Sequence, residues 1–252
     1  MFNDTLHDIH LFENGMQIIS GNDLEKWRAE TLFTKEPETI AWLNSFSEKS
    51  THFFDVGANI GIYSLYAAYI NKKLNVYSFE PVLNNFNTLY KNKLLNKLNN
   101  LTPFHLALSS TSKLETIYIS DTRVGNSGAQ ISAPINELGE SFTSLAHEIV
   151  LSLNIDKMIA EYGFPVPDFV KIDVDGHEID ILEGAKTTLA NPLVRSILIE
   201  INGQDNLVNI DMILTKSGFT PDDRFNFLEN HSSKRRREKK GNVAKNVVYT
   251  KL

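Results

Sequence analysis

Short apolar runs alternate with segments of helical periodicity along most of the chain. Each run has the length of one buried strand, and together the runs cover residues 52–56, 74–79, 101–108, 169–172 and 194–202. The segments between them carry apolar side chains three and four residues apart, as in 82–98. This alternation is typical of a parallel sheet with helices on both faces. We therefore predict a doubly wound, Rossmann-like α/β fold.

Residues 1–50 precede this alternation. Two segments, 23–30 and 37–43, are predicted as short helices, and the second begins with a proline in its first turn. We expect this N-terminal helical extension to pack over the edge of the sheet at which ligands bind.

Residues 113–150 interrupt the alternation between the third and fourth strands. Segments 114–119 and 147–150 have strand patterns, and turn residues lie between them. The segment is longer than an ordinary connection in this fold class. We predict a β-rich insertion that covers the substrate, with Asn126 and Ser127 as substrate-binding residues. The alternative is a β-structure that only shields an edge of the sheet.

The C-terminal part of the chain is expected to complete the sheet. A helix over 207–217 ends at Gly218, and segments 219–227 and 244–249 are expected to pair as an antiparallel edge. A basic run, 234–240, lies between these two segments. A solvated loop is the leading interpretation of such a run.

The alternative for the basic run is a clamp for a phosphate or a nucleotide-sugar. In that interpretation Arg235 and Arg236 bind the substrate, because arginine binds phosphate oxygens in a bidentate manner. Nucleic acid is the weakest interpretation, since the run has no interleaved aromatic residues.

Composition indicates one globular domain over residues 1–252. The formal net charge is −6, so there is no electrostatic argument for binding to nucleic acid or to an anionic membrane. The chain has no cysteine, which excludes disulfides, thiolate nucleophiles and thiolate metal sites. The N-terminus lacks the regions of a signal peptide, and no apolar run reaches membrane-spanning length. We expect a cytoplasmic protein.

A glycine-bearing loop follows the first strand and opens a helix. Asp55 stands at the end of the strand, and Gly57, Asn59 and Gly61 follow. Gly57 lets the chain turn sharply, and Gly61 removes a side chain where the helix packs on the sheet. A dinucleotide loop presents backbone N–H groups to a pyrophosphate, but Asp55 would repel a phosphate and attract the ammonium of a cationic cofactor. We predict that these four residues bind S-adenosylmethionine.

A second carboxylate, Glu80, ends the next strand and is followed by Pro81. A carboxylate about twenty residues after such a loop commonly binds the ribose hydroxyls. We predict that Glu80 and Pro81 hold the ribose side of the cofactor and that the adenine lies near Ala107. A lone Gly-x-x-x-Gly loop is more often only a tight turn, but the two carboxylates at strand ends favour a cofactor site.

Ionisable residues gather after the fourth strand. Asp173, Asp175, His177 and Glu178 lie within six residues, and Glu200 lies near the end of the next strand. Because the carboxyl ends of parallel strands share one edge of a sheet, we expect Asp173 and Glu200 to face the cofactor crevice. Asp175 is expected to cap the helix that follows.

Together these motifs resemble the FkbM-type S-adenosylmethionine-dependent methyltransferases. The resemblance rests on segments 55–61, 79–81, 171–178 and 182–185, and it covers about residues 30–202. It implies a seven-stranded methyltransferase sheet and, commonly, O-methylation of a hydroxyl on a sugar or natural product. Asp175 stands where the family more often has glutamate, and His177 where small residues are common.

Methyl transfer from a sulfonium needs alignment, a water-poor site and removal of the proton of the acceptor hydroxyl. We assign Asp173 to contact with the acceptor or its proton and His177 as the competing general base. Glu178 and Glu200 would orient either residue. The product would be S-adenosylhomocysteine. A histidine on the helix surface is an equal alternative for His177.

Other interpretations remain open. Asp173 with Glu200 or Glu178 could hold Mg²⁺ through oxygen ligands, although their spacing establishes no octahedral site. A nicotinamide-dependent oxidoreductase could use a similar sheet, but Asp55 disfavours it. A non-catalytic module would bind the cofactor and methylate nothing. No motif specifies the acceptor among sugars, glycan precursors, nucleotide-sugars and related metabolites, and none decides between a monomer and a homo-oligomer.

Overall fold

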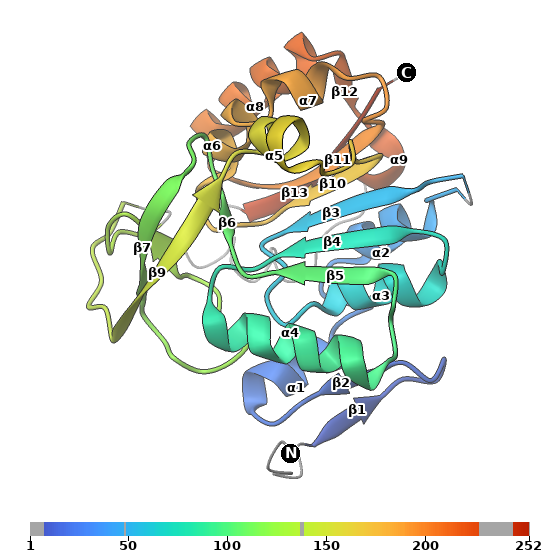
Figure 1. The fold of residues 1–252 in the computed structure, drawn as a ribbon, viewed down its shortest axis with the longest axis vertical. Coiled ribbons are helices and arrows are strands. Elements are labelled where there is room, and N and C mark those ends of the chain that lie inside the picture. Colours follow the sequence, from blue (N-terminus) through green and yellow to red (C-terminus); the bar gives the residue numbers. More distant parts are fainter. Residues whose placement is uncertain (1–7, 48, 137–138, 227–243, 252) are drawn as a thin grey trace.

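A seven-stranded sheet forms the centre of the molecule (Figure 1). The computed structural model describes residues 8–47, 49–136, 139–226 and 244–251. The sheet has the order β12-β13-β11-β10-β3-β4-β5, and its strands pair in parallel except that β13 is antiparallel to β11 and β12. The strands are β3 (His52–Val56), β4 (Asn75–Phe79), β5 (Leu101–Phe104), β10 (Phe169–Ile172), β11 (Ser196–Asn202), β12 (Phe219–Pro221) and β13 (Ala244–Lys251). This confirms the predicted doubly wound, Rossmann-like sheet.

Helices cover both faces of the sheet because successive side chains of a strand point to opposite faces. Phe53 and Phe169 belong to the core under α2, α3 and α9, whereas Phe54 and Val170 belong to the core under α5 to α8. Helix α4 lies beside α3 and the edge strand β5. The helices are α2 (Pro37–Asn44), α3 (Ile62–Ile70), α4 (Leu83–Leu95), α5 (Ile155–Tyr162), α6 (Glu178–Glu183), α7 (Lys186–Ala190), α8 (Gln204–Lys216) and α9 (Asp223–Asn226).

A second sheet has the order β6-β9-β7-β8. Its strands are β6 (Ala107–Leu108), β7 (Lys113–Ile119), β8 (Gln130–Ile131) and β9 (Ala146–Leu153). The single strand predicted over 101–108 is therefore wrong, because only β5 belongs to the central sheet. The chain leaves that sheet after Phe104, and the backbone of β6 pairs with β9 instead. Both halves of the run are apolar, so periodicity could not separate them.

The N-terminal part holds a β-hairpin that the sequence pattern did not indicate, as well as helices. The hairpin consists of β1 (Ile9–Leu11) and β2 (Gln17–Ile19), and α1 (Asp23–Glu30) follows it. Two asparagines of the α4 region bind β2, since the Ile19 N–H donates to Asn92 Oδ1 at 2.8 Å and the Gln17 N–H to Asn96 Oδ1 at 2.8 Å. Helix α1 borders the ligand edge of the sheet, but α2 packs on a face of the sheet through Trp42.

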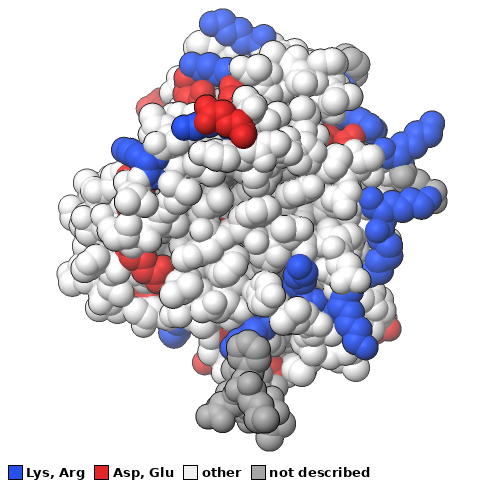
Figure 2. All heavy atoms as spheres, viewed as in Figure 1, with Lys and Arg blue, Asp and Glu red and all other residues white. Residues whose placement is uncertain are grey.

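Charged side chains are unevenly spread over the surface. Figure 2 shows lysine and arginine gathered along the side of the molecule where β3, β4 and β5 begin, away from the carboxyl ends of these strands. Within the described residues, no helix combines the length and the apolar character needed to cross a membrane.

Candidate functional site

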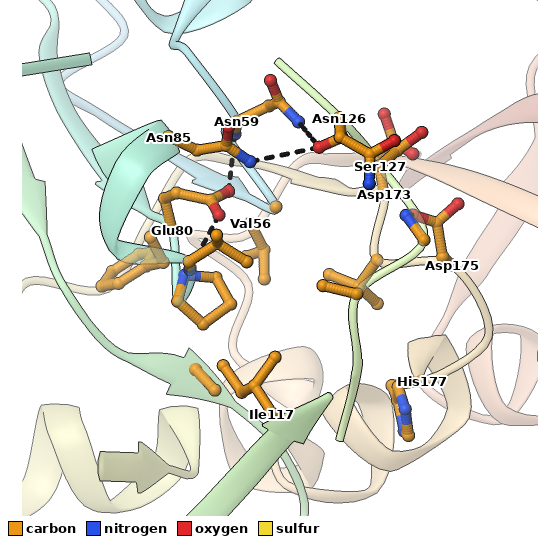
Figure 3. A pocket seen from close by; sticks show the side chains of 18 of the residues that line it. Val56, Asn59, Glu80, Asn85, Ile117, Asn126, Ser127, Asp173, Asp175 and His177 are labelled. Atoms are coloured by element: carbon orange, nitrogen blue, oxygen red, sulfur yellow. Dashed lines mark hydrogen bonds between the residues drawn. The ribbon is translucent and has the colours of Figure 1, made fainter. Parts of the chain in front are cut away.

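A cavity of about 340 Å³ opens at the carboxyl ends of β3, β4 and β10. The strand order reverses here, because β4 lies on one side of β3 and β10 on the other. Ligands of open α/β sheets bind at this point. The lining includes Val56, Gly57, Asn59, Glu80, Pro81, Ala107, Ile117, Asn126, Ser127, Asp173, Asp175, His177 and Glu200. Figure 3 shows Glu80 on one side of the cavity and Asp173 and His177 on the opposite side.

The two glycines of the first loop allow close packing. Gly57 has φ +77°, and a Cβ there would lie 1.9 Å from the carbonyl oxygen of Asp173, so the loops after β3 and β10 can touch only at a glycine. Gly61 has φ +85°, and a Cβ there would lie 2.8 Å from Cγ of Leu89. Gly57 lines the cavity. Gly61 lies outside its lining and makes room for α4, not for the sheet as expected.

Asp55 does not line the cavity, which corrects its assignment as a direct cofactor ligand. The side chain is 1% exposed and accepts a hydrogen bond from the Ser64 hydroxyl, and its Oδ1 lies 3.8 Å from Nζ of Lys171. Burial raises the pKa of Asp55, and Lys171 offsets this only in part. Asp55 is thus a buried counter-charge beneath the site.

Glu80 and Asn59 form one wall of the cavity. The two carboxylate oxygens of Glu80 accept from the N–H groups of Asn59 at 2.7 Å and Val82 at 2.9 Å. Asn59 has φ +54°, a left-handed conformation that asparagine tolerates, and this conformation accompanies the contact of its N–H with Glu80. The Asn85 side chain is a third donor to this carboxylate, and because two carboxylate oxygens have about four lone-pair sites, acceptor capacity remains. Burial raises the pKa of Glu80 to about 7.

Residues 124–130 cross the cavity as a strap within the predicted insertion. The carbonyl oxygen of Asn126 accepts from the amides of Asn59 at 2.8 Å and Asn85 at 3.1 Å, as Figure 3 shows. At the far end, the Gly128 N–H donates to Asp175 Oδ2 at 2.8 Å. The strap carries both predicted substrate-binding residues of the insertion, Asn126 and Ser127, into the cavity lining.

Asp173 lies at the carboxyl end of β10 and lines the cavity. Nζ of Lys171, which is 1% exposed, donates to Asp173 Oδ2 at 2.8 Å. Burial alone would raise the pKa of Asp173, but Lys171 and Lys35 outweigh burial and hold it below its usual value. Asp173 therefore carries a fixed negative charge into the cavity.

Glu200 and Asp175 complete the acidic side of the cavity. Burial, followed by the charges of Asp173 and Asp175, raises the pKa of Glu200 well above its usual value. The expected role of Asp175 as a helix cap is wrong, because His177 occupies the N-cap position of α6 and Asp175 has φ +53°. Asp175 instead anchors the strap.

His177 is 24% exposed, and its ring lines the cavity. Nδ1 lies 3.5 Å from Asp180 Oδ2, and Nε2 is buried without a hydrogen-bond partner among the described residues. Glu178 lies outside the cavity lining and is 2% exposed. It accepts a hydrogen bond from the Gly176 N–H at 3.1 Å and so stabilises the turn after β10.

The described parts of the chain hold no group of three or more histidine and carboxylate side chains arranged to bind a metal. The assignments to Arg235 and Arg236 lie outside the described residues. Three polar residues of the lining, Arg28, Lys35 and Asn85, were not predicted from the sequence. Arg28 and Lys35 come from the N-terminal extension, where a helical pattern gives no sign of a ligand. Asn85 lies in the crossover helix. Its position only five residues after Glu80, the carboxylate at the end of the strand, was a signal in the sequence that it could reach the ligand site.

The lining has the chemistry of a site for S-adenosylmethionine. Pro81, Ala107 and Ile117 supply apolar surface that suits an adenine, and Glu80 keeps acceptor capacity that suits ribose hydroxyls. Asp173 supplies a negative charge that would attract a cationic cofactor.

The chain is similar to proteins of known activity. The profile of the methyltransferase FkbM domain matches residues 55–221. The hexuronic acid methyltransferase AglP of Haloferax volcanii is 27% identical over 194 residues, which cover 77% of this chain and 73% of that enzyme.

Two solved structures share the fold at low sequence identity. The METTL16 methyltransferase domain has a TM-score of 0.51 at 13% identity and covers 96% of this chain and 86% of its own. The ribosomal protein L11 methylase of Lactobacillus delbrueckii subsp. bulgaricus has a TM-score of 0.50 at 10% identity and covers 86% of this chain and 79% of its own.

Proposed function

The chain belongs to the FkbM family of S-adenosylmethionine-dependent methyltransferases, and from this premise we propose that it methylates a hydroxyl oxygen of an acidic sugar. The sugar is either free or part of a glycan precursor or nucleotide-sugar. The observation that carries the acceptor class is the similarity to a hexuronic acid methyltransferase, which extends over 77% of this chain.

Cofactor binding is assigned to one side of the cavity. Glu80 accepts hydrogen bonds from the ribose, since its two backbone donors and the Asn85 side chain leave acceptor capacity on the carboxylate. Pro81 and Ala107 contact the adenine, and Asn59 and Gly57 shape the loop beside it. When bound, S-adenosylmethionine supplies an electrophilic methyl group on a sulfonium. Asp55 and Gly61 lie beneath this side of the cavity and do not contact the cofactor.

Proton removal from the acceptor is assigned to His177. The ring lines the cavity, and its buried Nε2 has no partner in the described chain, so a rotation of the side chain would let this nitrogen accept the hydroxyl proton. The Asp180 carboxylate, 3.5 Å from Nδ1, stabilises the imidazolium that results. Asp173 is the weaker base because its pKa is lowered, and it serves instead as an acceptor for the hydroxyl before its proton leaves. Glu200 lines the cavity and forms a hydrogen bond with the acceptor.

The test is methyl transfer from ¹³C-methyl S-adenosylmethionine to paired acceptors, a glucuronoside and the corresponding glucoside. We expect the glucuronoside to gain a methyl ether that resists alkali. An alkali-labile product would be an ester on the carboxyl group and would contradict the hydroxyl assignment. Binding of S-adenosylhomocysteine without transfer to any sugar would favour a non-catalytic module.

A further inference from the structure

Arg28 is a cation of the N-terminal extension that lines the cavity beside Trp27. Its Nε donates to the carbonyl oxygen of Gly125 at 2.6 Å, which fixes the guanidinium against the strap. This hydrogen bond uses only one of the five N–H donors of the side chain. The two terminal nitrogens remain, and their planar edge matches the two oxygens of a carboxylate.

The other cations at the site already have carboxylate partners. Lys35 forms an ion pair with the buried carboxylate of Glu36. Lys171 lies 2.8 Å from Asp173 and 3.8 Å from Asp55. Arg28 differs, because within the described residues no carboxylate comes within the 4.0 Å distance of an ion pair.

Arg28 lines the same cavity as Glu80 and Asp173. Its positive charge acts on Glu80 at the cofactor end and on Asp173 at the acceptor end, in both cases favouring the ionised carboxylate. A half-buried guanidinium in this place, oriented by one hydrogen bond and without an acidic partner, has the properties of a ligand-binding group.

We propose that Arg28 is the carboxylate-binding residue of the cavity. A carboxylate reaches this site from two sources. One is the methionine moiety of S-adenosylmethionine, and the other is the acidic sugar, which rests on the proposed function above. In either case the terminal nitrogens of Arg28 bind the carboxylate in a bidentate manner.

The cofactor arm of the test uses calorimetry with two ligands that differ by one group. S-adenosylhomocysteine has the carboxylate, and S-adenosyl-3-thiopropylamine lacks only the carboxylate. The variant Arg28→Gln keeps an amide donor for Gly125 and removes the charged fork. Lys26→Gln is the matched control, because Lys26 lies on the same helix with 62% of its side chain exposed and is absent from the cavity lining.

If the cofactor is the source, Arg28→Gln weakens binding of S-adenosylhomocysteine by about 10- to 100-fold, as expected for loss of a charged hydrogen-bonded pair. Binding of the thiopropylamine changes less than about twofold. Arg28→Lys recovers only part of the affinity, because an ammonium keeps the charge without the fork. Equal weakening of both ligands would overturn the proposal, since it would indicate a displaced strap.

The acceptor arm uses saturation-transfer NMR with D-glucuronate and D-glucose in the presence of S-adenosylhomocysteine. If the sugar is the source, Arg28→Gln loses glucuronate binding and leaves glucose binding and S-adenosylhomocysteine affinity unchanged. Wild-type protein that binds no glucuronate would contradict the acidic-sugar acceptor, and the cofactor arm alone would then decide the role of Arg28. If Arg28→Gln gives the same results as the control Lys26→Gln in both arms, the proposal is overturned.

Discussion

The burial of Glu80 makes binding of S-adenosylhomocysteine dependent on pH. Glu80 is 4% exposed, and burial raises its pKa to about 7. Ribose hydroxyls donate to the ionised carboxylate, whereas protonation converts one acceptor oxygen into a donor. Binding should therefore weaken as the pH falls through 7.

The size of the effect follows from that pKa. If only the ionised form binds, the fraction ready to bind is roughly one tenth at pH 6 and nine tenths at pH 8, so the affinity should change about 10-fold between these values. A 10-fold change corresponds to about 1.4 kcal/mol of binding free energy. Isothermal calorimetry of S-adenosylhomocysteine at pH 6 and pH 8 measures it directly.

Two variants separate Glu80 from other titrating groups. Glu80→Gln cannot ionise, so its affinity should be lower by about 10- to 100-fold and should not change over this pH range. Glu178→Gln is the matched control, because Glu178 also has a pKa of about 7 and does not line the cavity. It should keep the wild-type pH dependence. Equal wild-type affinity at pH 6 and pH 8, or loss of the dependence in Glu178→Gln, would refute the assignment of Glu80.

Further predictions concern the buried charges and the proposed base. Lys171→Met leaves Asp55 and Asp173 without their cation and should lower the free energy of unfolding by about 3–5 kcal/mol in urea denaturation, and a loss below 1 kcal/mol would contradict the buried ion pair. Burial raises the pKa of Glu178 from 4.5 in the unfolded chain to about 7, so its stabilising contribution is complete below pH 4.5 and lost as the pH rises through 7. Between pH 4 and pH 8 the free energy of unfolding should therefore fall by roughly 3 kcal/mol more in the wild type than in Glu178→Gln. An equal fall in the two proteins would contradict this. His177→Asn should lower kcat by about 10²- to 10⁴-fold and leave S-adenosylhomocysteine affinity intact, and an unchanged kcat would exclude His177 as the base.

The alternation of strands and helices predicted the central sheet because each element carries its own periodicity. The carboxylates at strand ends, Glu80 and Asp173, were also predictable, because parallel strands bring their carboxyl ends to one edge. The structure places both in the cavity lining. These inferences need only the local pattern and the topology that the pattern implies.

The role of Asp55 could not be predicted in this way. Parallel pairing places Lys171 of β10 directly beside Asp55 of β3, so the carboxylate meets a buried cation beneath the site. Strand register between segments so distant in sequence leaves no local signature. The same holds for Arg28, whose contact with Gly125 joins the N-terminal extension to the strap across 97 positions. Long-range contacts of this kind decide which strand-end residues face the ligand.

The most direct test of the cavity as the cofactor site is a crystal structure of the protein grown with S-adenosylhomocysteine. We expect the adenosyl group in the cavity at the carboxyl ends of β3 and β4, with both ribose hydroxyls within hydrogen-bond distance of the Glu80 carboxylate. A ligand bound elsewhere, or one in the cavity whose ribose makes no contact with Glu80, would contradict the account.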